Sequence, residues 1–368
     1  MTAHSRLAPS SYGRLAHCRA APIMEAMFPG EDTMPSLEGH AQHHVAYCMA
    51  VRPDELPLIG SLFESVEITQ EMYDGARMYL DDIASELGAS WRQHVHLEER
   101  VDLSGLHPEA WGTLDARAQY PGFLYFWDDK FGHRYVDAFE NWQLIAYSYP
   151  FVAALSPEEE LTTSVQFTIV QPRNFHPDGP IRRWTVKAYE LRAYYNTLRG
   201  WLAEATTEGV AANPVPAACQ DCSARHACVA LRNAAYAGMD YARQAQAHNL
   251  SPDQLGTELA RVEDMTKLLE AYQSGLQEEA EGALRRGVSV PNYTLAPGRS
   301  SLAWAVDEEI VASLGEELYA PRKLITPTQA RDRKLITSDL LEAYAHRPAG
   351  SLKLSRIDHK LAKKVFKS

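Results

Sequence analysis

The heptapeptide LYFWDDK, residues 124–130, decides how this sequence is interpreted. Its aromatic residues favour a strand, which we predict over residues 123–130. Because successive side chains of a strand point to opposite faces, Asp128 and Lys130 lie on one face and Asp129 lies on the other. A carboxylate and an ammonium group on one face can share a phosphate, with the carboxylate holding a divalent metal ion. On an exposed strand end, the same pair would be only a solvated ion pair.

A second carboxylate comes from the segment GTLD at residues 112–115. We predict a strand that begins at Gly112, where the missing side chain permits a close backbone approach. A turn near Pro121 joins this strand to the next one. If the two strands are neighbours, the turn brings Asp115 opposite Asp128, which supplies two hard oxygen ligands for Mg²⁺ or Mn²⁺.

The segment NWQLIAY, residues 141–147, lies in a helical pattern that we predict over residues 138–155. Gln143 and Tyr147 are four residues apart, so they share one face of this helix. An amide and a phenol on one face can bind a substrate phosphate or the edges of bases. The alternative is that both side chains pack the helix against the core.

Three histidines occur in a further predicted helix over residues 38–51, at His40, His43 and His44. Their spacing places them on one side of the helix. Such a trio can form a metal site unaided, although isolated histidines are more often surface or packing residues. We favour His43 alone, because a single imidazole is enough to complete an oxygen-rich Mg²⁺ or Mn²⁺ site.

Three of the five cysteines fall within CQDCSARHAC, residues 219–228, at Cys219, Cys222 and Cys228. Cysteines of a reducing compartment more often bind metal than form disulfides, so this spacing indicates a metal site. Three thiolates leave a tetrahedral or cluster site one ligand short, and either Cys18 or Cys48 must complete it. Zinc and an iron–sulfur cluster are both compatible with four thiolates.

The charge of the chain is unevenly distributed. The formal net charge of −12 argues against nucleic acid as a partner, but residues 321–368 carry 12 Lys and Arg against 4 Asp and Glu. A basic segment on an acidic body can attract a polyanion, and the plainer interpretation is that these lysines only solvate a terminus. The first twenty residues have no continuous apolar region, and no stretch is long and apolar enough for a membrane span, so we expect a cytoplasmic protein without a membrane partner.

The chain of 368 residues, 45% of them hydrophobic, is long enough to bury a large core. Its patterns follow the order helix, three strands, helix, strand, which predicts a mixed α/β core with one sheet covered on both faces. A long helix over residues 251–287 has an apolar stripe that is either a coiled-coil seam or, as we favour, packs against its own domain. We place the domain boundary after residue 245, with residues 1–245 as the core and 246–368 as a helical C-terminal region that ends in a basic tail.

Several of these segments together resemble a known group. The order of EGHAQHH, GTLD, WDDKFG and QLIAY is similar to the signature of the RecB-type nucleases of the PD-(D/E)xK superfamily. Cys18 with CQDCSARHAC resembles the subset of those nucleases that binds a [4Fe–4S] cluster, which includes AddB and the CRISPR-adaptation nucleases. The segments 169–173, 296–305, 324–330 and 350–360 extend the resemblance to a bacteriophage family of such nucleases.

The resemblance implies a role for each matching residue. It makes His43, Asp115 and Asp128 the metal ligands, together with the backbone carbonyl of Asp129, and it makes Lys130 the catalytic lysine. It places Gln143 and Tyr147 on the substrate side, and it assigns the cluster to Cys18, Cys219, Cys222 and Cys228, which leaves Cys48 without a role. The sequence departs from the pattern at one point, because the middle residue of D-x-K is usually apolar and here it is Asp129.

We therefore expect a restriction-endonuclease-like core with an iron–sulfur clamp. The expected activity is that of a Mg²⁺- or Mn²⁺-dependent deoxyribonuclease, more an exonuclease than an endonuclease, in phage DNA replication, recombination or end processing. The expected partners are DNA ends and phage single-strand-binding or recombination proteins. Two alternatives are a non-catalytic DNA-end-binding scaffold and a nuclease for CRISPR spacer processing, and zinc is the less favoured occupant of the cysteine site.

Overall fold

The computed structural model describes residues 5–30, 33–174, 176–243, 249–296 and 363–364 of the chain. The chain separates into two compact units, residues 1–289 and 290–368. All elements named below belong to the first unit. No helix in the described part is both long and apolar enough to cross a membrane.

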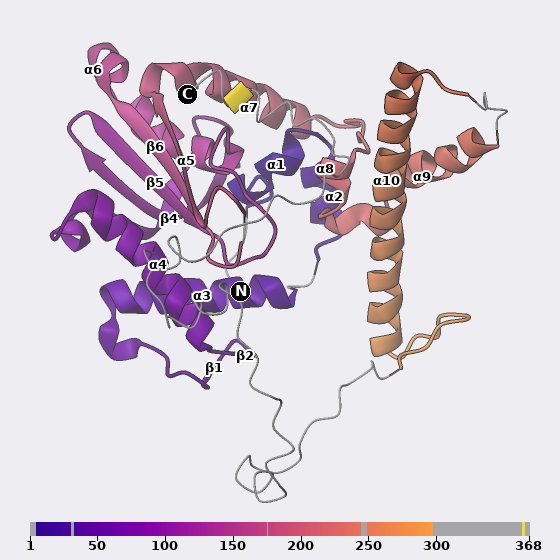
Figure 1. Ribbon diagram of the computed structural model, residues 1–368, viewed down its shortest axis with the longest axis horizontal. Coiled ribbons are helices and arrows are strands. Elements are labelled where there is room, and N and C mark those ends of the chain that lie inside the picture. Colours follow the sequence, from indigo (N-terminus) through magenta and orange to yellow (C-terminus); the bar gives the residue numbers. More distant parts are fainter. Residues whose placement is uncertain (1–4, 31–32, 175, 244–248, 297–362, 365–368) are drawn as a thin grey trace, which may run out of the picture. The chain divides into compact units, whose positions relative to one another are not determined.

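The centre of the first unit is a five-stranded mixed sheet in the order β3-β4-β5-β6-β7 (Figure 1). Neighbouring strands run antiparallel except β5 and β6, which run parallel. The parallel pair is joined by a helical crossover, as parallel strands require. The strands are β3 (Val95–Asp102), β4 (Trp111–Tyr120), β5 (Phe123–Asp129), β6 (Ser164–Val170) and β7 (Ile181–Lys187).

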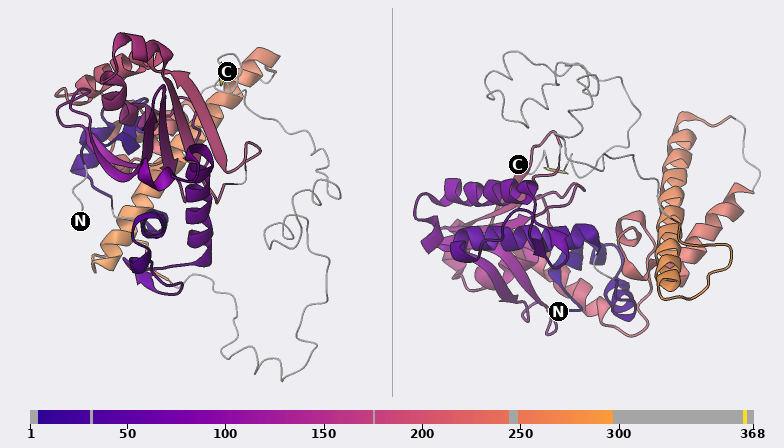
Figure 2. Two further views of the ribbon diagram at one scale, coloured as in Figure 1. Left: turned by 90° about the vertical axis from the view of Figure 1, so that its left-hand side faces the viewer. Right: turned by 90° about the horizontal axis from the view of Figure 1, so that it is seen from below.

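Helices cover both faces of this sheet, which confirms the predicted mixed α/β core. On one face lie α3 (Met34–Val51) and α4 (Gln70–Leu87), and on the other lie α5 (Trp142–Ala153) and α7 (Leu191–Ala205) (Figures 1 and 2). Each face buries a separate apolar core against its helices. The sequence analysis predicted β3 to β6 and the helices before and between them, but it placed no element at β7 or α7.

Local side-chain contacts explain where the helices beside the site begin and end. The Thr69 hydroxyl accepts a hydrogen bond from the backbone N–H of Met72 and so caps α4, which ends at Gly88 with φ of 77°. Asn141 caps α5 in the same way, so this helix starts at Trp142 rather than at residue 138 as predicted.

The smaller elements surround this core. Two short strands, β1 and β2, pair after α3, and α6 follows α5. The N-terminal segment forms short helical pieces. These elements are η1 (Pro9–Ser11), α1 (Tyr12–Leu15), α2 (Ala21–Met27), η2 (Pro53–Glu55), β1 (Leu62–Phe63), β2 (Val66–Glu67), η3 (Trp91–Gln93), α6 (Pro157–Thr162) and η4 (Ala188–Glu190).

The cysteine-rich segment forms α8 (Pro216–Cys219) and η5 (Ser223–His226), followed by α9 (Val229–Ala242). The long helix α10 (Pro252–Arg285) packs on these elements through Leu268, Ala271 and Gly275. The boundary expected after residue 245 falls at residues 244–248, outside the described residues, and stays a prediction. The basic segment 321–368 also lies outside them, apart from Lys363 and Lys364.

The two faces of β5 match the predicted alternation. Leu124 and Phe126 belong to the core under α5 and α7, whereas Trp127 belongs to the core under α3 and α4. All three side chains are almost fully buried. Asp128 and Asp129, the next two residues, therefore lie on opposite faces of the sheet at the end of β5.

Candidate active site

Asp115 and the end of β5 meet across the β4–β5 pair. The β4–β5 register ends at the pair Ala116 and Trp127, and Asp115 and Asp128 are the next residues of the two strands. The backbone N–H of Asp129 donates to Asp115 Oδ2 at 2.7 Å. The turn near Pro121 thus produces the juxtaposition that the sequence indicated.

On the α5 side of the sheet, Asp128 and Lys130 form a buried ion pair. Lys130 Nζ donates to Asp128 Oδ1 at 2.8 Å, and Gln143 Nε2 donates to the same oxygen at 2.7 Å. The Asp128 side chain is 2% exposed and that of Lys130 is 30% exposed, so Lys130 is the partly exposed member of the pair. Burial raises the pKa of Asp128 to about 6 even though Lys130 opposes the rise.

On the opposite side, Asp129 points towards α3. Its Oδ2 accepts a hydrogen bond from Gln42 Nε2 at 2.8 Å, and the residue is 2% exposed. Burial raises the pKa of Asp129 to about 7. The buried amide of Gln42 therefore accommodates a polar residue at the middle position of D-x-K. The sequence analysis did not single out Gln42, although it directly precedes His43.

His43 joins the helix to both strands. Its Nε2 lies 2.9 Å from the backbone oxygen of Asp129 and 3.8 Å from Asp115 Oδ2. Its Nδ1 lies 3.4 Å from Glu98 Oε1. Burial alone would lower the pKa of this imidazole, but the surrounding carboxylates, Asp115 foremost, outweigh burial and raise it. The site therefore attracts positive charge to the position of His43.

Glu98 is the residue of this cluster that the sequence analysis missed. It adopts a φ of 49°, a left-handed conformation that costs a non-glycine residue about 1–2 kcal/mol. The strand changes face at this point, because Leu97 packs in the core under α3 and α4 while Val101 packs in the core under α5. In the sequence Glu98 looks like any exposed strand residue, so no local signal distinguishes it.

This cluster has the composition of a divalent metal site. One ligand atom each of His43, Glu98 and Asp115 can be chosen so that all lie within 4.8 Å of one another. They line a cavity of about 10 Å³, close to the smallest volume that holds a water molecule. Two buried carboxylate oxygens beside them, Asp128 Oδ2 and Asp129 Oδ1, have no hydrogen-bond partner among the described residues. Carboxylates with an imidazole suit Mg²⁺ or Mn²⁺, so the residues fit such an ion.

Tyr147, the second residue of the predicted substrate-side pair, lies deeper than Gln143. It is 3% exposed in the core under α5, and burial raises its pKa. A Cβ atom at Gly112 would lie 2.6 Å from the Tyr147 hydroxyl oxygen. The close approach expected at Gly112 is therefore made by this phenol, whereas Gln143 contacts the Asp128–Lys130 pair directly.

The other two histidines of α3 lie away from the carboxylates. His40 Nδ1 is 3.9 Å from Glu64 Oε2 at the exposed end of the helix. His44 stacks on Phe63, with ring centroids 4.3 Å apart, and its Nε2 lies 3.7 Å from Cys48 Sγ. The structure thus brings His43 alone to the carboxylates, and it places Cys48 on α3.

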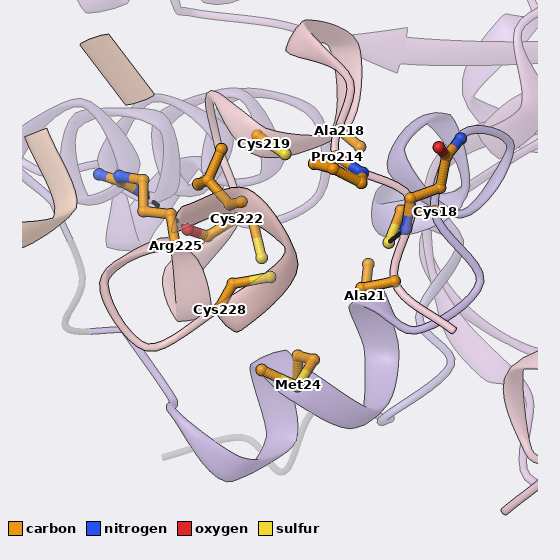
Figure 3. Close-up of a pocket in the computed structure, with 12 residues that line it drawn as sticks. Cys18, Ala21, Met24, Pro214, Ala218, Cys219, Cys222, Arg225 and Cys228 are labelled. Carbon is orange, nitrogen blue, oxygen red and sulfur yellow. Dashed lines mark hydrogen bonds between the residues drawn. The ribbon is translucent and has the colours of Figure 1, made fainter. Parts of the chain in front are cut away.

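A second site lies at the cysteine-rich segment. Cys18 comes from the N-terminal segment and lines one pocket together with Cys219, Cys222 and Cys228 (Figure 3). Burial raises the pKa of the Cys219 thiol to about 12, and the other three cysteines add to the rise. Four thiols around one pocket fit a metal or cluster that binds four thiolates, because such a group would replace the thiol protons.

Comparison with known proteins places the chain in a family. The family model described as "Protein of unknown function (DUF2800)" matches residues 4–361. The chain belongs to the DUF2800 family. Among solved structures, the DUF2800 chain is similar to a crystal structure of a "Putative exonuclease" from Eubacterium rectale, with 12% sequence identity over 67% of this chain and 90% of that chain. The TM-score is 0.35, so this likeness carries no argument about function.

Proposed function

We propose that this DUF2800 protein is a metal-dependent DNA nuclease. The observation that carries the proposal is the Lys130–Asp128 pair, which stands across the strand pair from Asp115 and beside the metal-compatible set His43, Glu98 and Asp115. The resemblance of the motifs to the RecB-type PD-(D/E)xK nucleases assigns these residues except Glu98, and it adds Asp128 as a metal ligand. We further propose that it acts on DNA ends as an exonuclease in phage replication, recombination or end processing.

The residues of the chain supply three parts of the reaction. Lys130 is a partly exposed cation held in place by Asp128 and Gln143, so it can stabilise negative charge that develops on the phosphate oxygens. His43, Glu98 and Asp115 would hold Mg²⁺ or Mn²⁺, and the backbone oxygen of Asp129 lies beside them. When bound, such an ion neutralises phosphate charge and lowers the pKa of a water molecule.

The experiment is a cleavage assay on end-labelled single- and double-stranded DNA with Mn²⁺. Asp128→Ala and Lys130→Ala should each lower the rate about 100-fold or more, because Lys130 stabilises the developing charge and Asp128 holds Lys130 in place. Asp81→Ala is the matched control, since Asp81 is exposed on α4 away from both sites. Release of single nucleotides from the labelled end indicates an exonuclease, and internal fragments indicate an endonuclease. DNA binding without cleavage by the intact protein would instead support a scaffold.

We also propose that Cys18, Cys219, Cys222 and Cys228 bind a [4Fe–4S] cluster with a structural role. Their common pocket supports four-thiolate ligation, and the choice of the cluster over zinc comes from the resemblance. The cluster would tie the N-terminal segment to the loop between α8 and α9. Anaerobically purified protein should be brown and contain iron and sulfide, whereas a colourless protein with stoichiometric zinc would contradict the assignment.

A further inference from the structure

A second cavity, larger than the first, adjoins the metal-compatible site. Its volume is about 330 Å³, and we call it the β3 cleft; its walls include Tyr47, Trp91, Arg92, His96, Leu97 and Glu99. Tyr47 and Leu97 also line the small cavity that contains His43 and Asp115. On α3, Tyr47 lies one helical turn after His43, so one face of this helix contributes to the walls of both cavities. The β3 cleft is therefore a direct neighbour of the position where a phosphate would react.

Three planar side chains in the lining of the β3 cleft are at least partly exposed, and Trp91 beside them is 4% exposed. The Tyr47 ring is partly exposed, and the Arg92 guanidinium stacks over the Trp91 ring at 4.3 Å from its centroid. His96 adds an exposed imidazole from β3. Planar aromatic and guanidinium groups offer π-faces on which nucleobases stack regardless of their sequence.

The charges of the cleft also suit a nucleotide. Glu99 is neutralised by Arg117, whose Nη2 donates to Glu99 Oε1 at 2.9 Å as one of two hydrogen bonds between them. Arg92 has no ion-pair partner among the described residues, and it is exposed at the mouth of the cleft. One cation thus stays available for a backbone phosphate, and Glu99, the carboxylate among the lining residues, is paired with Arg117.

The size of the cleft limits what can enter. Its volume is at the lower end of the range for small-ligand pockets, about 300–1,000 Å³, which is enough for one nucleobase, and a base can stack on the planar side chains only when it is unstacked from its own strand. We propose that the β3 cleft binds a single unstacked nucleobase of the strand whose phosphate lies at the metal site, so that the substrate is single-stranded DNA or a frayed end. This inference rests on the proposed nuclease function and names the substrate form that the same site accepts.

The test is a binding cycle between a protein side chain and a DNA base. Single-stranded oligonucleotides that contain one abasic position, moved step by step along the strand, are titrated against the full-length protein in Ca²⁺. The intact protein should lose about tenfold in affinity when one particular position is abasic. Tyr47→Ala should lose about tenfold on the complete oligonucleotide and should no longer respond to that abasic position.

Three further variants separate stacking from folding. Tyr47→Phe keeps an aromatic ring and should retain both the affinity and the response to the abasic position. Tyr189→Ala removes an exposed tyrosine outside both cavities and should behave as the intact protein does. Arg92→Ala, at an exposed position, should also weaken binding, and its thermal melting should match that of the control.

The outcomes distinguish this inference from the proposed function. Two results would show that the β3 cleft does not bind a base, even when the protein cleaves DNA. In the first, the abasic position lowers the affinity of Tyr47→Ala as much as it lowers that of the intact protein. In the second, no abasic position lowers the affinity of the intact protein. A response that Tyr47→Ala abolishes supports the cleft even if the intact protein fails to cleave DNA, in which case only the nuclease proposal fails.

Discussion

Glu98 offers the sharpest test of the candidate site, because its backbone and its carboxylate make separate contributions. We compare Glu98→Ala with Glu98→Gly. Both variants remove the carboxylate, so the loss of charge near His43 and Asp115 is the same in both. They differ only in the backbone, where the φ of 49° is unfavourable for alanine and allowed for glycine.

The expected difference follows from two opposing terms. A left-handed conformation costs a residue with a side chain about 1–2 kcal/mol. Glycine loses about 0.4–1 kcal/mol of this advantage, because it gains conformational freedom in the unfolded chain. Glu98→Gly should therefore be more stable than Glu98→Ala by about 0.5–1 kcal/mol, which corresponds to a shift in Tm of about 2 °C in a protein of this size.

The carboxylate adds a metal-dependent effect. At a Mn²⁺ concentration of about 100 times Kd, binding stabilises the intact protein by about 2.7 kcal/mol, whereas a tenfold weaker site contributes only about 1.4 kcal/mol. Both variants should therefore lose about half of the stabilisation by Mn²⁺.

Guanidinium unfolding in EDTA and in Mn²⁺ measures both effects. Equal stability of the alanine and glycine variants in EDTA would refute the strain at Glu98. Full Mn²⁺ stabilisation of both variants would show that Glu98 is not a ligand.

The remaining predictions concern the cysteine pocket and two close glycine contacts. Cys18→Ser should remove most of the bound iron or zinc, measured by elemental analysis, whereas Cys48→Ser should leave the metal content unchanged because Cys48 lies on α3 outside the pocket. Gly275→Ala should speed metal loss to a chelator, because its Cβ would lie 2.5 Å from a side-chain carbon and 2.8 Å from a backbone nitrogen of η5. Gly256→Ala is the control on the same helix. Its Cβ would meet nothing within 4 Å, so it should leave the rate of metal loss unchanged. Gly112→Ala should destabilise the fold by about 1–3 kcal/mol in urea unfolding, since its Cβ would meet a buried tyrosine hydroxyl at 2.6 Å, and an unchanged midpoint would contradict that packing.

The core of the fold was predictable because it depends on local patterns. The alternation in LYFWDDK predicts both faces of β5, and the turn near Pro121 predicts which strand is its neighbour. The segment 181–187 alternates less clearly, because Arg182 is buried in a hydrogen-bond network with Gln171 while its neighbours are more exposed. Its strand, β7, was therefore missed.

The composition of the candidate site depended on contacts between distant segments. Asp115, Asp128 and Lys130 could be grouped because one short turn connects their strands, and the spacing along the chain almost specifies their distance. Gln42 and Glu98 could not be grouped with them. Gln42 reaches Asp129 only because α3 packs over β5, and Glu98 faces the cluster only because its strand changes face at a left-handed residue.

The same division applies to the cysteines and to the β3 cleft. The spacing of Cys219, Cys222 and Cys228 already indicates a metal site, because three ligands within one loop are near each other in any fold. Whether Cys18 or Cys48 lies near them depends on which distant segment packs beside that loop, and the packing places Cys18 in the same pocket. Ligands that are close in the chain are encoded by their spacing, whereas ligands and cleft walls that are far apart are set by the register of strands and the packing of helices.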